Sequence, residues 1–104
     1  MKHKLLSTLC ICRKAGKLVM GFDKTAEAAR NGTVALILLS GDLSPKSAKE
    51  MAFAAGKYGT ELCSAPINMD EIQHRLGKRS GILGVTDPGL ADTLKQMCRI
   101  CEEE

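Results

Sequence analysis

The residues of this sequence that could act in catalysis do not form a recognisable catalytic set. The two histidines, His3 and His74, both lie among polar residues, which is typical of solvated histidines. Ser80 could be paired with His74 as nucleophile and base, but nothing in their spacing supports such a pair. Asp87 directly precedes Pro88 and is interpreted as a helix cap. We therefore predict that the chain is not an enzyme.

The glycines do not form a motif for a nucleotide cofactor. Gly16-Lys17 lacks the earlier, spaced glycine and the following serine or threonine of a P-loop. Gly77, Gly81 and Gly84 do not follow a predicted strand, so they do not make a dinucleotide-binding fingerprint. We expect no cofactor.

The cysteines do not indicate a metal site. There are five of them: Cys10, Cys12, Cys63, Cys98 and Cys101. Cys98 and Cys101 form a CxxC near the end of a predicted helix, but a zinc site normally needs a second pair of ligands. Cys10 and Cys12 lie two positions apart on a predicted helix and so point to different faces. We expect no metal, and we expect reduced thiols.

Residues 17–32 contain a chemical feature of another kind, a junction that suits an anion. Lys17 to Met20 is a short apolar run that breaks at Gly21, and an alanine-rich helix follows until Gly32. A strand that enters a helix through glycine leaves unpaired backbone N–H groups at the start of the helix. Such groups suit a phosphate or a nucleic-acid backbone.

The charge of the chain is consistent with a polyanionic partner. The net charge is +3, and without the three C-terminal glutamates 15 basic residues face nine acidic ones, a net charge of +6. The basic residues form three groups, which are Lys2, Lys4, Arg13, Lys14 and Lys17, then Lys24 and Arg30, then the loop around 75–79. Because aromatic residues make up 3% of the chain, base stacking cannot be the main binding mode. This favours recognition of a folded RNA through its shape and backbone.

Length and hydropathy predict one domain over residues 1–101, followed by an acidic tail at 102–104. The 44% hydrophobic content is enough for a packed core. The longest apolar run, Val34 to Leu39, is too short to cross a bilayer, and basic residues interrupt any signal-peptide core near the N-terminus. We therefore expect a cytoplasmic protein with no membrane partner.

Hydrophobic periodicity and helix-cap residues predict an alternation of helices and strands. Helices are expected at about 3–15, 23–31, 45–58, 69–76 and 88–101, and strands at 17–20, 34–39, 61–65 and 82–85. Ser44-Pro45 and the capping box Asn68–Glu71 mark two of the helix starts. The strand at 34–39 is apolar on both faces and is expected at the centre of the sheet. The pattern predicts an α/β fold, a three-layer α/β/α sandwich with a mixed sheet of about four strands.

The segment from Lys14 to Thr25, KAGKLVMGFDKT, resembles the L7Ae/L30e/S12e/Gadd45 superfamily of kink-turn RNA-binding proteins. It is close to the SGKxVxG[YF]KxT pattern of the L30e branch, and the chain is also similar to the small YlxQ-like bacterial proteins. Asn31-Gly32, the apolar strand after it and Asp87-Pro88-Gly89 fit as well. The resemblance covers nearly the whole chain in order and length.

The resemblance implies a non-enzymatic RNA-binding protein whose contacts come from two segments. In that family the turn after the first strand meets the sheared G·A pairs of a kinked RNA, and the loop before the fourth strand closes over an extruded base. On this sequence the contacts fall on Lys17, Gly21, Phe22, Asp23, Lys24 and Glu27, and on Gly77, Lys78, Arg79, Ser80, Gly81 and Ile82. The two carboxylates among them would repel phosphate unless they face base donors. Ribosomal RNA, and with it the ribosome, is among the implied partners, as is a regulatory RNA.

The residues are also compatible with two other functions. The same scaffold could be a protein-interaction module without an RNA target, its acidic positions facing a basic partner. A small hydrolase acting through His74 and Asp87 is the third hypothesis.

Overall fold

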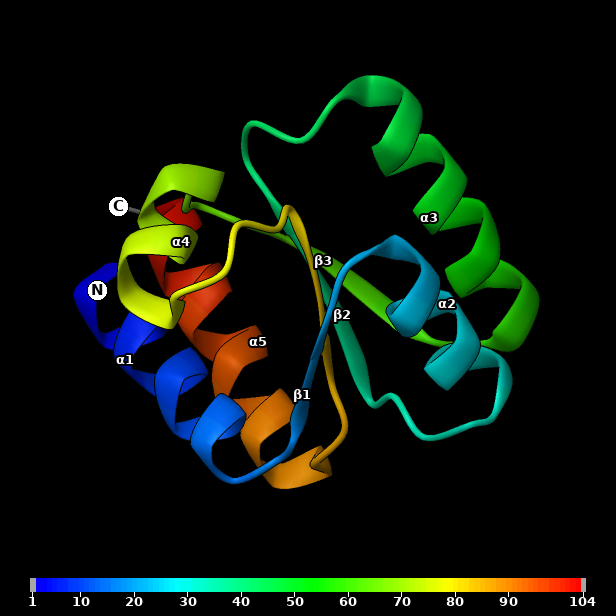
Figure 1. The fold of residues 1–104 in the computed structure, drawn as a ribbon, viewed down its shortest axis with the longest axis horizontal. Coiled ribbons are helices and arrows are strands. Elements are labelled where there is room, and N and C mark those ends of the chain that lie inside the picture. The colour runs from blue at the N-terminus through cyan, green and yellow to red at the C-terminus, as the bar shows by residue number, and fades with distance from the viewer. Residues whose placement is uncertain (1, 104) are drawn as a thin grey trace.

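The computed structural model describes residues 2–103, with the backbone alone described for residues 100–103. Within this part the chain forms five helices and four strands in the predicted order (Figure 1). They are α1 (Lys2–Lys14), β1 (Leu18–Met20), α2 (Phe22–Arg30), β2 (Leu36–Ser40), α3 (Pro45–Tyr58), β3 (Glu61–Ala65), α4 (Met69–Leu76), β4 (Ile82–Val85) and α5 (Pro88–Glu103). The predicted acidic tail includes Glu104, which lies outside the described residues, as does the side chain of Cys101.

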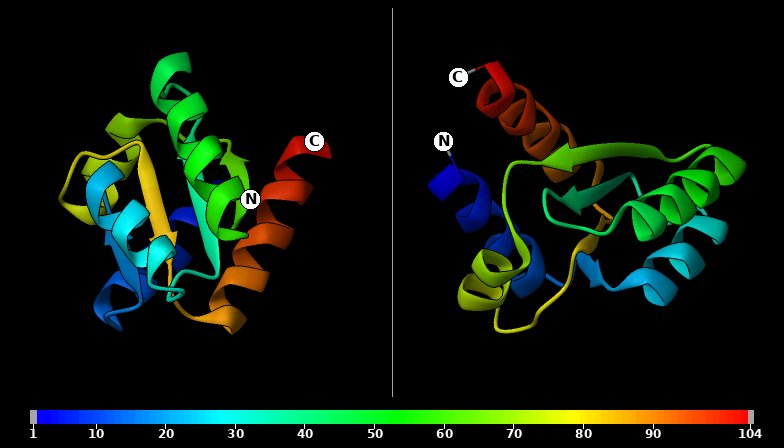
Figure 2. Two further views of the ribbon diagram at one scale, coloured as in Figure 1. Left: turned by 90° about the vertical axis from the view of Figure 1, so that its right-hand side faces the viewer. Right: turned by 90° about the horizontal axis from the view of Figure 1, so that it is seen from above.

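The elements form the predicted three-layer sandwich. Figure 1 shows α1, α4 and α5 on one face of the sheet and α2 and α3 on the other, and Figure 2 shows the same layers from two further sides. The sheet order is β1-β4-β2-β3, with β2 and β3 parallel and the other two pairs antiparallel. The sheet is therefore mixed, and β1 and β3 are its edge strands.

Strand β2 is buried on both faces, as its apolar sequence predicts. Leu36 and Leu38 belong to the core beneath α1, α4 and α5, whereas Ile37 and Leu39 belong to the core beneath α2 and α3. This alternation follows from the two-residue period of a strand. The sandwich thus has two hydrophobic cores, one on each side of a continuous sheet.

The residues predicted as helix caps make the expected contacts. The Asn68 side chain accepts from the N–H of Glu71 over 2.8 Å, and the Glu71 carboxylate accepts from the N–H of Asn68 over 3.0 Å. Ser44 Oγ accepts from the N–H of Ser47 over 3.2 Å. Asp87 accepts from the first N–H groups of α5, which confirms its interpretation as a cap.

The strand pairing brings several loops to one end of the sheet. Met20, the last residue of β1, pairs with Leu83 near the start of β4. The N–H of Ser40, the last residue of β2, donates to the carbonyl of Gly81 over 2.9 Å. The junction between β1 and α2 and the loop at 77–81 before β4 therefore lie at the same end of the sheet.

Candidate nucleic-acid interface

A backbone hydrogen bond joins the β1–α2 junction to the segment that precedes β4. The N–H of Gly21 donates to the carbonyl of Ile82 over 3.0 Å. Ser80 Oγ donates to the same carbonyl over 2.9 Å and accepts from the N–H of Ile82 over 3.2 Å. Two segments that are far apart in the sequence are thus held side by side.

Gly21 lets the chain turn from β1 directly into α2. Its φ of 101° and ψ of 159° belong to a region that is essentially restricted to glycine. Gly21 is the N-cap of α2, and it provides no side chain to bond the first turn. The N–H groups of Phe22, Asp23 and Lys24 therefore have no acceptor among the described side chains, which leaves the start of α2 suited to an anion.

The loop at 77–81 is anchored by a glycine at each end. Gly77 ends α4 in the left-handed conformation, with a φ of 82°. Gly81 packs so closely that a Cβ there would lie 2.7 Å from Leu43 Cδ1 and 2.9 Å from Ser40 Oγ. Because the backbone is anchored at both ends, the two basic residues between the glycines are presented from a defined position, and both are exposed.

Three cations, one each from α1, α2 and the loop at 77–81, line one cavity beside the edge strand β1. This cavity of about 180 Å³, the β1 cavity, is lined by Arg13, Leu18, Val19, Met20, Lys24 and Lys78. Arg13 is held in place because its Nη1 donates to the carbonyl of Leu76 at the end of α4. Among the described residues, none that lines the β1 cavity is a carboxylate, so its local charge is positive.

Arg79 is partly neutralised within the protein. Its guanidinium forms an ion pair with Asp70 in the first turn of α4. The side chains are 48% and 81% exposed, respectively, and a pair this exposed contributes about 0–1 kcal/mol to stability. Such a weak pair leaves Arg79 able to exchange its carboxylate partner for a phosphate.

Asp23 and Glu27 line a different cavity from their neighbour Lys24. This second cavity, of about 210 Å³, is lined by Asp23, Ala26, Glu27, Arg30 and Tyr58. The α2 positions among them recur at helical spacing, whereas Lys24 lies on the adjacent face. The carboxylates are thus separated from the cations of the β1 cavity, and they can accept from base amino groups without facing the same phosphates.

One residue predicted as a contact is placed apart from this group. The carbonyl of Lys17 accepts from the N–H of Thr86, which follows β4, so Lys17 lies at the opposite end of the β1–β4 pair from Gly21. Phe22 is half-buried and packs against the core beneath α2 and α3. The structure brings together Gly21, Lys24 and the loop at 77–81, but not Lys17.

Sequence reasoning does not single out Arg13 as a site residue. In the sequence it is one of several basic residues near the end of the first helix, where the helix dipole favours a cation in any case. Its place beside Lys24 and Lys78 depends on how α1 packs against α4. No sequence pattern within either helix predicts that contact.

In the part of the chain that the structure describes, the candidate catalytic residues make no hydrogen bond or ion pair with one another. Ser80 precedes β4 and Asp87 follows it, so the two side chains lie at opposite ends of one strand. The Ser80 hydroxyl is bonded to the backbone of Ile82, and the Asp87 carboxylate caps α5. His74 is exposed in the last turn of α4.

Cys12 is fully buried in the core beneath α1, α4 and α5. Burial raises the pKa of its thiol above the ordinary value, and the negative charge of Asp87 raises it further. The group is therefore kept as an unreactive thiol. Within the described part of the chain, no cluster of three or more histidine, cysteine or acidic side chains could hold a metal ion.

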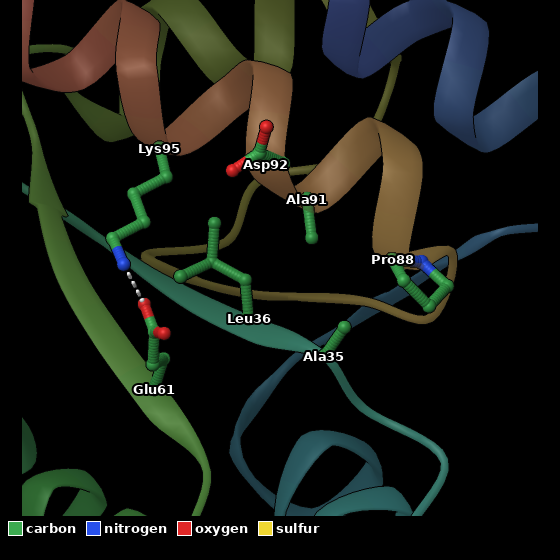
Figure 3. Close-up of a pocket in the computed structure, with 7 residues that line it drawn as sticks. All are labelled: Ala35, Leu36, Glu61, Pro88, Ala91, Asp92 and Lys95. Carbon is green, nitrogen blue, oxygen red and sulfur yellow. Dashed lines mark ion pairs between the residues drawn. The ribbon is translucent and has the colours of Figure 1, made fainter.

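A cavity at the other end of the sheet has a different character. It measures about 200 Å³ and lies between α5 and the starts of β2 and β3 (Figure 3). Glu61 and Lys95 form an ion pair of 2.6 Å there, and the Asp92 carboxylate also lines it. These acidic groups make it less suited to a phosphate than the β1 cavity.

None of the helices between residues 2 and 103 has the length and apolar character needed to cross a bilayer.

Over 96 residues the chain is 24% identical to the RNA-binding protein YlxQ of Enterococcus faecium, with 92% of each chain covered. It is 30% identical over 90 residues to the large ribosomal subunit protein eL30B of Schizosaccharomyces pombe, covering 85% of this chain and 77% of that one.

The fold is also found in a solved structure of a Bacillus halodurans protein. That structure superposes with a TM-score of 0.83 at 26% identity, covering 92% of this chain and 97% of the other. The sequence pattern of one family matches residues 3–95, which is most of the chain. The protein thus belongs to the ribosomal protein L7Ae/L30e/S12e/Gadd45 family.

Proposed function

We propose that this protein is a non-enzymatic RNA-binding protein that recognises a kink-turn or a similar bent internal loop in ribosomal or regulatory RNA. The observation that carries the proposal is the junction between Gly21 and Ile82, which places the start of α2 beside the loop at 77–81. Arg13, Lys24 and Lys78 converge on the cavity next to that junction. A sharply bent strand brings its phosphates close together, and a compact group of cations offsets their repulsion.

The two sides of α2 would serve different parts of such an RNA. Lys24 and the first N–H groups of α2 face phosphate, which positions the backbone. Asp23 and Glu27 line the second cavity and accept hydrogen bonds from base edges, which provides specificity. The loop at 77–81 then covers a base that the bend has released from its stack, with Lys78 and Arg79 against the flanking backbone.

The named relatives support this proposal. One is called an RNA-binding protein and another is a component of the large ribosomal subunit. Ribosomal RNA is therefore the first class of RNA to test for binding, and association with the ribosome is part of the proposal.

A salt titration with variants tests the site. A kink-turn RNA and a fully paired duplex of the same composition are titrated with the wild-type protein and with Lys24→Gln and Lys78→Gln. Each variant should reduce the slope of log K against log salt by about 0.7–0.9, the share of one phosphate contact. The wild-type protein should prefer the kink-turn RNA to the duplex.

Lys49→Gln is the matched control, because Lys49 is exposed on α3 and lines none of the cavities described above. It should leave both affinity and slope unchanged. Equal affinity for the two RNAs would overturn the kink-turn part of the proposal. Affinity that does not respond to salt, or to either site variant, would overturn RNA binding at this end of the sheet.

A further inference from the structure

We infer that the groove between α1 and α4 is a second backbone-binding surface, which holds the RNA strand that leaves the bend. This inference rests on the proposed function and extends it beyond the predicted contact segments. The groove is a cavity of about 430 Å³ lined by Cys10, Arg13, Lys14, Arg75 and Leu76. It is the largest of the cavities described here, and three of its five lining residues are cations.

The two helices are fixed in register by direct contacts along the groove. Cys10 Sγ donates to the carbonyl of Arg75 over 3.3 Å, and Arg13 donates to the carbonyl of Leu76. Figures 1 and 2 show α1 and α4 side by side on the same face of the sheet. The groove is therefore a preformed feature of the fold.

The positive charge in the groove is not neutralised by the described side chains. The Arg75 guanidinium contacts Ser7 Oγ over 2.7 Å and His3 Nδ1 over 3.2 Å, and Arg13 is bonded to a backbone carbonyl. These partners orient the two guanidinium groups without cancelling their charge. Lys14 is exposed and makes no ion pair with a described residue.

The groove adjoins the proposed RNA site at a shared residue. Arg13 lines both the groove and the β1 cavity, where it lies with Lys24 and Lys78. A strand bound at the β1 cavity can therefore continue along α1 and remain in contact with cations. Phosphate groups recur at every nucleotide, so a row of positive groups fits the backbone of a continuing strand.

The positive charge in the groove also has a structural role, at the ends of α1 and α4. Arg13, Lys14 and Arg75 all lie in the last turns of their helices, where the helix dipole favours cations. Arg13 and Arg75 also hold α1 and α4 together. Replacing either would therefore lower the stability of the fold as well as RNA affinity, and the two effects could not be told apart. Lys14 is exposed and makes no such contact, and it is the residue whose substitution separates the two roles.

The test uses two forms of one kink-turn RNA, one with a stem that continues beyond the bend and one truncated at the bend. Lys14→Gln should weaken binding of the continuing form about three- to tenfold at low salt and reduce its salt slope by about 0.7–0.9. It should leave binding of the truncated form unchanged. Lys4→Gln is the matched control, since Lys4 is an exposed lysine near the other end of the same helix.

The outcomes separate this inference from the proposed function. If Lys14→Gln behaves like Lys4→Gln on both RNAs while Lys24→Gln still weakens both, the groove is not a binding surface and the proposed site stands. If neither Lys14→Gln nor Lys24→Gln weakens binding of either RNA, both are overturned. A urea unfolding midpoint equal to that of the wild-type protein shows that a loss of binding by Lys14→Gln is not a loss of fold.

Discussion

The N–H of Gly21 donates to the carbonyl of Ile82 over 3.0 Å, and this bond continues the pairing of β1 and β4 by one position beyond Met20 and Leu83. It places the start of α2 against the end of the loop at 77–81. A functional surface made of these two segments therefore depends on the backbone of one short edge strand, which has three residues.

Replacement of Gly21 by alanine should destabilise the protein by about 1–3 kcal/mol. A Cβ at this position would meet no atom within 4 Å, so the cost arises from the backbone conformation and not from a clash. Urea unfolding at neutral pH measures the change. RNA affinity should fall as well, because relaxation of φ would turn the start of α2 away from the loop at 77–81.

Gly56→Ala is the control for the glycine-to-alanine change itself. Gly56 is exposed within α3, has no positive φ, and a Cβ there would also meet no atom within 4 Å. Alanine should stabilise this helix by about 0.5–1 kcal/mol. If Gly21→Ala were as stable as the wild-type protein, the strained turn would not be needed for the fold.

Replacement of Glu27 by glutamine should reduce discrimination between RNAs without changing the salt slope. The carboxylate lines the second cavity and, in the proposed function, accepts from base donors, so it does not contribute a phosphate contact. A base contact of this kind is worth about 1–3 kcal/mol of discrimination. The measurement is the ratio of affinities for a kink-turn RNA and for the same RNA with its G·A pairs replaced.

Glu50→Gln is the matched control, since Glu50 is an exposed glutamate on α3 that makes no ion pair with a described residue. It should leave the ratio unchanged. A Glu27→Gln protein that binds more tightly to both RNAs by the same factor would show that the carboxylate acts through repulsion of phosphate and not through base recognition.

The elements of this fold were predictable because their signals are local. The capping box at Asn68–Glu71 and the serine–proline start of α3 at Ser44-Pro45 bond as their sequence patterns predict. The apolar strand β2 is buried on both faces because helices cover the two sides of the sheet. Several boundaries differ from the prediction by one or two residues, since the last hydrogen bonds of an element depend on its neighbours.

The composition of the candidate site was less predictable, because part of it depends on packing between segments that are distant in the sequence. Lys17 belongs to the same motif as Gly21, but the two residues flank β1, so the extended strand holds them at opposite ends of the β1–β4 pair. Asp23 and Lys24 are adjacent, yet a helix turns them to different cavities. Arg13 joins the site through packing of α1 on α4, which no spacing within either helix reveals.

Replacement of Gly84 by alanine should destabilise the β1–β4 pair by about 1–3 kcal/mol. A Cβ at this position would lie 2.7 Å from Val19 Cγ2 and 3.1 Å from Thr25 Cγ2. Val19 is directly opposite Gly84 in the sheet, and a β-branched side chain has little freedom to move away. The double variant Gly84→Ala with Val19→Ala should recover part of the loss in urea unfolding, and additive losses would contradict the clash.

The stability of the protein should fall as the pH rises above the ordinary pKa of a cysteine thiol, about 9.0, because of Cys12. Burial and the charge of Asp87 raise the pKa of this thiol in the folded protein, so the native state retains a proton that the unfolded chain has lost. The stabilising contribution is fully present below the unfolded pKa and is lost as the pH rises toward the folded one. The largest slope for one group is about 1.4 kcal/mol per pH unit.

Urea unfolding between neutral pH and the alkaline range measures this slope in the wild-type protein and in Cys12→Ala. The alanine variant should be less stable at neutral pH, where it lacks the packed thiol, but its free energy of unfolding should decline less steeply above pH 9. Parallel declines in the two proteins would show that other groups carry the alkaline loss and that the Cys12 thiol does not contribute to it.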